Sequence, residues 1–118
     1  MAYIGSMFTL LLFACSSEPA ELDVMLHTID PDPPVAGDVV ATLHLSWADD
    51  GEPVTDAEVH VTPWMTAHGH GIDTPPEVAE LGDGQYEADF AFSMPGTWEL
   101  QVDVDDGAGQ GSVEVEVE

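Results

Sequence analysis

The sequence predicts an all-β protein: an immunoglobulin-like antiparallel β-sandwich of about seven strands that follows an N-terminal signal peptide. Three observations predict it. Apolar and polar residues alternate with period two along several short segments, turn residues separate those segments at spacings of about 8 to 15 residues, and no segment has helical periodicity. Because each such strand is apolar on one face, packing two sheets face to face buries the apolar faces.

Residues 1–14 are apolar and end just before the single cysteine, Cys15. Their apolar run of about eleven residues is too short to cross a membrane, which needs about 20, and has the length of the hydrophobic part of a signal peptide. The residues Leu12-Phe13-Ala14-Cys15 resemble a bacterial lipobox. This resemblance implies cleavage before Cys15, lipidation of its sulfur and an extracytoplasmic, membrane-anchored lipoprotein.

The lipobox resemblance has one departure, because residues 1–14 contain no Lys or Arg, which signal peptides normally carry. A start codon assigned too far downstream would explain it. The alternative is a buried Cys15 thiol in a short N-terminal helix. If Cys15 is lipidated, the chain has no second cysteine for a disulfide, and packing alone must hold the core.

Residues 15–33 are predicted to hold the lipidated cysteine, a tether and the first strand, in which Leu22, Val24 and Leu26 share one face. Closely spaced prolines end that strand, since proline donates no backbone hydrogen bond. The sandwich domain is predicted over residues 34–118. Its six strands are expected at residues 39–47, 57–62, 78–81, 86–92, 98–104 and 113–117.

Three aromatic residues in these strands are expected to lie in or near the core. Trp47 and Trp98 fall on the apolar faces of their strands. Tyr86 follows a Gly-Asp-Gly turn at the start of a strand, an arrangement that resembles the tyrosine corner of Greek-key sandwiches. An ordinary core aromatic would produce the same pattern.

The chain has 24 Asp and Glu residues, five His and no Lys or Arg. Nucleic acid is therefore not an expected partner, because there is no cationic side chain to set against a phosphate. Metal cations and basic partners are compatible with this charge. The acidic groups repel one another, so the folded protein is expected to be more stable in salt.

The segment 63–71, PWMTAHGHG, concentrates thioether and imidazole groups in a glycine-containing turn. Met65, His68 and His70 are the ligand types that copper takes where thiolate is absent, since Met favours Cu(I) and His binds both oxidation states. His68 and His70 flank a single residue, so in an extended segment their side chains share a face.

A fourth ligand would come from elsewhere in the chain. Met94, in the turn before the Trp98 strand, is the first candidate, and His44 and His60 are the next. Zinc is an alternative metal, because His and the many carboxylates could supply its four ligands. His27 receives no role.

Two other interpretations of segment 63–71 stay open: a purely structural turn and a partner-binding tip. An enzyme is not predicted, because no nucleophile is paired with a histidine, and the paired acids Asp49-Asp50 and Asp105-Asp106 are typical of solvated turns. Nothing resembles a calcium-binding EF-hand loop.

Four landmarks in a fixed order resemble the YtkA-like domain family over about residues 34–104. They are GEPVTDAEV at 51–59, WM at 64–65 with HGH at 68–70, GDGQY at 82–86 and MPGTWEL at 94–100. The resemblance implies an immunoglobulin-like sandwich in an exported or membrane-anchored bacterial protein, similar to modules suspected of handling copper outside the cytoplasm. It implies no catalytic residues.

The sequence thus predicts a lipid-anchored extracytoplasmic β-sandwich module with copper as candidate ligand, bound by Met65, His68, His70 and Met94. The alternative is a non-catalytic protein-interaction module of the cell envelope, in which the His-Gly-His-Gly turn is structural. The expected partners are the membrane, through the lipid on Cys15, a metal cation and an envelope protein.

Overall fold

The computed structural model describes residues 19–118, in which there are eight β-strands and no helix. The strands are β2 (Ala20–Asp30), β3 (Gly37–Trp47), β4 (Val59–Met65), β5 (His70–Gly71), β6 (Glu77–Gly82), β7 (Gln85–Phe92), β8 (Gly96–Val104) and β9 (Gly109–Val117). Nothing in this part of the chain is a helix long and apolar enough to span a membrane.

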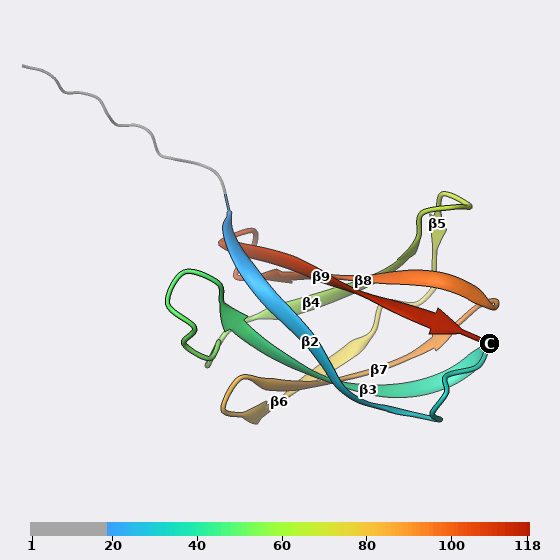
Figure 1. Cartoon of the computed structure of the whole chain (residues 1–118), viewed down its shortest axis with the longest axis horizontal. Helices are drawn as coiled ribbons and strands as arrows, with labels where there is room; N and C mark the ends of the chain where they lie inside the picture. Colours follow the sequence, from blue (N-terminus) through green and yellow to red (C-terminus); the bar gives the residue numbers. More distant parts are fainter. Residues whose placement is uncertain (1–18) are drawn as a thin grey trace, which may run out of the picture.

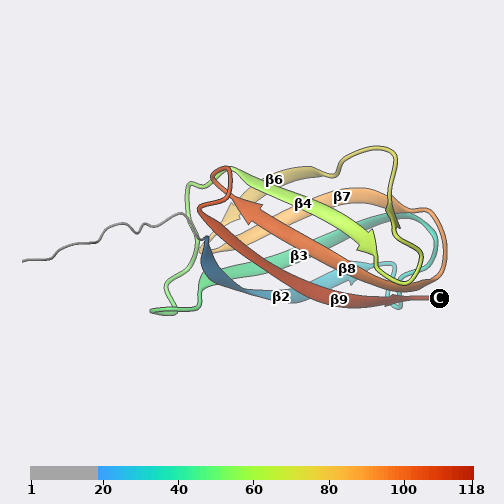
Figure 2. The same cartoon turned by 90° about the horizontal axis from the view of Figure 1, so that it is seen from above.

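The strands form one curled sheet in the order β5-β4-β8-β9-β2-β3-β7-β6. Its two halves, β5-β4-β8-β9 and β2-β3-β7-β6, lie over one another as the two layers of a sandwich (Figures 1 and 2). The predicted immunoglobulin-like β-sandwich is therefore confirmed. Each of the seven predicted strands is present, and the two-residue β5 is an addition.

β2 joins the two layers. Its first residues, Ala20 and Glu21, pair in parallel with β9, and from Leu22 onward the strand pairs antiparallel with β3. Gly111 of β9 allows this close crossing, because a Cβ there would lie 2.5 Å from the Leu22 carbonyl oxygen. β2 is thus part of the sandwich, although the sequence pattern assigns its residues to the segment before the domain.

A register shift within β2 separates its two apolar stretches. The pairing with β3 slips between Leu26 and Thr28, so that His27 is the extra residue and lies exposed. Alternation starting at Leu22 would place Thr28 inside, but the shift places Ile29 there instead, and Ile29 is buried.

The core lies between the layers and contains apolar side chains from both. Its largest fully buried members include Trp98, Tyr86 and Phe92, and the Phe92 and Trp98 rings pack across the layers with centroids 5.2 Å apart. Trp47 is only partly buried at the edge of this cluster. No charged residue among those described is buried, so the acidic groups all lie at the surface.

β4 is longer than its sequence pattern suggests. The predicted strand ends at residue 62, but β4 continues through Pro63 and Trp64 to Met65, pairing with β8 as far as Trp64. Pro63 is tolerated because β5 pairs only with Trp64 and Met65, which leaves the preceding part of β4 at the edge of the sheet. The first residues of segment 63–71 are therefore strand.

Candidate functional site

The tight turn after β4 brings the two loop histidines together. The backbone N–H groups of His68 and Gly69 both donate to the Met65 carbonyl, at 3.1 and 2.8 Å, and Gly69 has a φ of 67° that favours glycine. The chain then returns as β5, in which His70 pairs with Met65. The rings of His68 and His70 have centroids 5.9 Å apart.

His70 is held in a fixed orientation. Its half-buried ring packs edge-on against the buried Trp98, with centroids 5.8 Å apart and an interplanar angle of 76°. Its Nδ1 lies 3.1 Å from the Gly71 carbonyl oxygen. Because a carbonyl can only accept, Nδ1 is the donor in this bond, and in the neutral imidazole Nε2 then has the lone pair. Histidines that bind metals are commonly oriented by such a bond.

Met65, which pairs with His70 across the β4–β5 turn, is in the core and only 1% exposed. Its side chain reaches the turn between β7 and β8, where its methyl group sits against Gly96 in the space that a Cβ would need. Gly96 has a φ of 135°, which glycine adopts without strain. The thioether is thus close to the turn that carries Met94.

Met94 lies in this turn and is partly buried against the core. Its carbonyl oxygen accepts a hydrogen bond from the Trp98 indole N–H at 3.0 Å. Trp98 therefore contacts both the Met94 backbone and the His70 ring. All four predicted ligand residues lie in or beside the β4–β5 and β7–β8 turns, at one end of the sandwich, with His68 exposed, His70 and Met94 partly buried, and Met65 buried.

The other two candidate ligands lie elsewhere. His60 is near the start of β4, five residues before Met65, and His44 pairs with Gln85 at the start of β7. β7 runs from Gln85 to Phe92, next to the Met94 turn, so His44 lies toward the opposite end of its layer. The fold does not bring either histidine to the His68–His70 pair.

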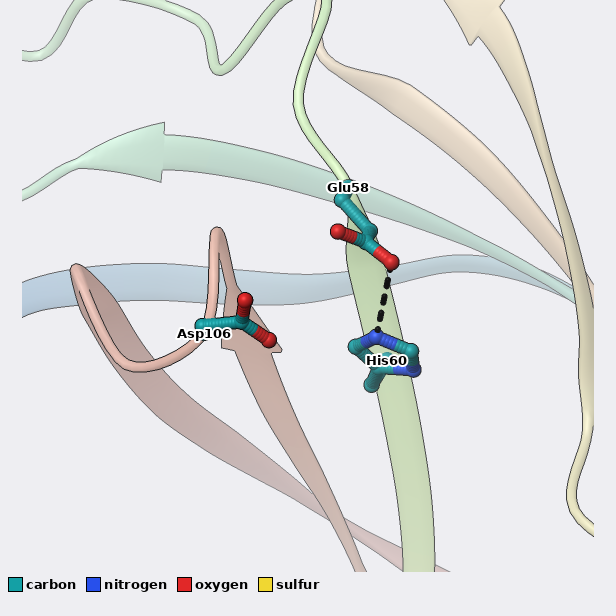
Figure 3. Close-up of side chains that lie close together, drawn as sticks. All are labelled: Glu58, His60 and Asp106. Carbon is teal, nitrogen blue, oxygen red and sulfur yellow. Dashed lines mark ion pairs between the residues drawn. The ribbon is translucent and has the colours of Figure 1, made fainter.

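A second group of possible ligands does include His60. Glu58, His60 and Asp106 each offer one ligand atom, and these atoms lie within 4.8 Å of one another (Figure 3). His60 Nε2 is 3.4 Å from a Glu58 carboxylate oxygen. The period-two spacing of Glu58 and His60 could have suggested this pair. Asp106 comes from the β8–β9 loop, and only the tertiary structure brings it there.

The predicted lipidation site, Cys15, and the predicted signal peptide, residues 1–14, lie outside the described residues. The structure therefore bears on the sandwich and its two groups of candidate ligands.

Comparisons with known proteins agree with the fold. A family model described as YtkA-like matches residues 17–103. Among solved structures, the filamin domain of Lin-41 is similar, with a TM-score of 0.54 and 13% sequence identity, over 87% of this chain and 98% of that chain. At this identity the likeness concerns the fold alone. A comparison with curated protein sequences found no match.

Proposed function

The chain belongs to the YtkA-like family, and from this premise we propose that it is a lipid-anchored module outside the cytoplasm that binds a copper ion through its Met/His loop. The fold and family give an immunoglobulin-like β-sandwich module. Export, the anchor on Cys15 and copper binding are the proposal.

The observation that carries copper binding is the spacing of His68 and His70. A bond of about 2 Å between imidazole nitrogen and metal puts each ring centre about 3 Å from the ion, so two rings on one ion have centres about 5–6.5 Å apart. The observed 5.9 Å falls in this range. His70 is also already oriented, with Nε2 as its available ligand atom.

The methionines make copper a better candidate than a harder metal ion. Thioether sulfur is a soft ligand that selects Cu(I), and neither magnesium nor calcium favours it. Met94 lies in the turn beside the Trp98–His70 contact, and Met65 packs beneath that turn. Copper would be held by His68 and His70 with thioether from these methionines, and the acidic surface would attract the cation.

Copper titration tests this proposal. The full chain, purified in detergent, is titrated with Cu(I) in competition with a chromophoric Cu(I) chelator. We expect one ion per chain, and at least tenfold weaker binding by the His68→Ala/His70→Ala variant. A His27→Ala variant is the matched control, because His27 is exposed in the β2 bulge, and it should bind as the parent does.

Equal binding by the parent and the double variant would contradict the copper proposal. The packing of His70 on Trp98 and of Met65 under Gly96 would then be purely structural, as in a protein-interaction module. The anchor has a separate test: the parent should incorporate labelled fatty acid and Cys15→Ser should not, and equal labelling of the two, or none in the parent, would count against lipidation.

A further inference from the structure

We propose that Glu58, His60 and Asp106 form a second metal site, for a divalent ion of the zinc class, at the opposite end of β4 from the Met/His loop. This proposal does not rest on copper binding, since the two sites share no ligand. It rests on the geometry of three side chains, on how the fold holds them and on their chemistry.

The ligand atoms are close to zinc-binding distances. Zn²⁺ bonds to imidazole nitrogen and carboxylate oxygen at about 2.0–2.2 Å, so the ligand atoms of a tetrahedral site are about 3.3–3.6 Å apart. His60 Nε2 and the Glu58 carboxylate already lie 3.4 Å apart. One ligand atom from each of the three residues lies within 4.8 Å of the other two, and the third residue is Asp106, beside the Glu58–His60 pair (Figure 3). Small rotations of these exposed side chains would bring all three ligand atoms to the spacing of a zinc site. Water would be the fourth ligand.

Neighbouring acids hold the β8–β9 loop in place. The Glu58 N–H donates to the Asp105 carboxylate and the Asp105 N–H donates to the Glu58 carbonyl, both at 2.9 Å. The Gly107 N–H donates to the Asp103 carboxylate at 2.8 Å. Asp103 and Asp105 thus fix the loop to β8 and to the start of β4. Among the described residues, none donates a hydrogen bond to the carboxylate of Glu58 or Asp106, apart from the contact between His60 and Glu58. Both carboxylates are therefore available to bind a metal ion.

The chemistry of the three groups indicates a borderline metal ion. One imidazole and two carboxylates form a nitrogen–oxygen set, which suits zinc, whereas Ca²⁺ takes six to eight oxygens. The imidazole also distinguishes the site from a simple acidic patch. The chain has no Lys or Arg, so histidine is its only side chain that can offset the charge of these carboxylates, and a cation from solution would add to that.

The site lies where the described chain enters the sandwich. The Ala20 N–H donates to the Ala108 carbonyl at 2.9 Å, so the start of β2 lies beside the β8–β9 loop, and the β4–β5 turn is at the other end (Figures 1 and 2). The five residues from His60 to Met65 span about 16 Å along β4. An ion at one site therefore cannot share ligands with the other.

A zinc titration in a background that lacks the loop imidazoles tests the proposal. The full chain carrying His68→Ala and His70→Ala, purified in detergent, is titrated with Zn²⁺ against a chromophoric chelator. We expect one Zn²⁺ per chain, and at least tenfold weaker binding when His60→Ala or Asp106→Asn is added. Asn tolerates the φ of 56° found at Asp106, so the loop conformation is kept.

As a control, adding His27→Ala to the same background protein, in place of His60→Ala or Asp106→Asn, should leave zinc binding unchanged. Circular dichroism of each variant checks that the sandwich is intact, which is expected because the His60 side chain is 58% exposed. Absence of zinc binding in the background protein, or equal binding with and without His60→Ala and Asp106→Asn, would overturn the proposal. Neither result would affect the copper titration, which depends on His68 and His70.

Discussion

Tyr86 illustrates how a single buried polar group ties distant parts of the chain together. Its hydroxyl donates to the Val54 carbonyl at 3.0 Å, across 32 residues, and the ring is buried. The bond thus links β7 to the segment between β3 and β4 and does not close a local turn. Burial, together with the charges of Glu80 and Asp56, raises the pKa of the Tyr86 phenol above its ordinary value of 10.0.

We predict that Tyr86→Phe lowers the free energy of unfolding at pH 7 by about 1–3 kcal/mol, because the buried Val54 carbonyl loses its donor. The raised pKa also means that the folded state holds the phenol proton more tightly than the unfolded state. This stability is fully present below pH about 10 and is lost as the pH rises toward the folded pKa. Urea unfolding of both proteins at pH 7 and above pH 10 measures both effects.

An unfolding free energy of the variant equal to that of the parent at pH 7 would contradict the role given to the Tyr86–Val54 bond. A parent protein whose loss of stability above pH 10 matches that of Tyr86→Phe would contradict the raised pKa.

The sequence pattern predicts the candidate ligands unequally well, for a physical reason. Met65, His68 and His70 are neighbours in the chain, so a single turn suffices to bring them near one another, and the pattern is enough to name them as candidates. The burial of Met65 depends on Gly96, which is far away in sequence. Asp106 is the extreme case, because the Asp105-Asp106 pair looks like any solvated turn until the fold sets it beside His60.

At the scale of elements, alternation predicts every strand except β5, but not where the longer ones end. The pattern predicts that β4 stops before Pro63, since proline interrupts a central strand. Whether a strand lies at a sheet edge depends on its neighbours, which a local pattern does not contain. The local pattern also does not show that β2 crosses between the two layers, because this too depends on neighbouring strands. Gly109 and Gly111 in β9 mark where the crossing occurs.

We predict that Gly111→Ala destabilises the fold by about 1–3 kcal/mol, because the new methyl group would overlap the Leu22 carbonyl oxygen and force β2 away from β9. Ser112→Ala, at the next position and exposed, is the control and should have little effect. Chemical denaturation of the three proteins gives the comparison. If both variants unfold at the parent's denaturant concentration, the close crossing of β2 and β9 is not a constraint.

At the scale of the whole molecule, the main feature is the negative charge of its surface. The chain has 24 acidic residues and no Lys or Arg, and the described acids are all at the surface. Their mutual repulsion is felt over about 30 Å at 0.01 M salt and about 3 Å at 1 M. Unfolding separates these charges, so repulsion lowers the stability of the compact state at low salt.

We therefore predict that the melting temperature rises by at least several degrees between 0.01 M and 1 M NaCl. Tetramethylammonium chloride at equal ionic strength is the control that separates general screening from the binding of a small metal cation. Thermal melts that coincide at low and high salt would show that the acidic surface does not limit stability.

The central claim, that His68 and His70 bind one copper ion, is tested most directly by the nuclear magnetic resonance signals of the five imidazoles. Cu(I) is diamagnetic, so the ring nitrogens of each histidine can be followed while one equivalent is added to the full chain in detergent. The account predicts that the His68 and His70 signals shift together and saturate at one equivalent, while those of His27, His44 and His60 stay in place. Unchanged His68 and His70 signals, or equal shifts at all five histidines, would contradict it.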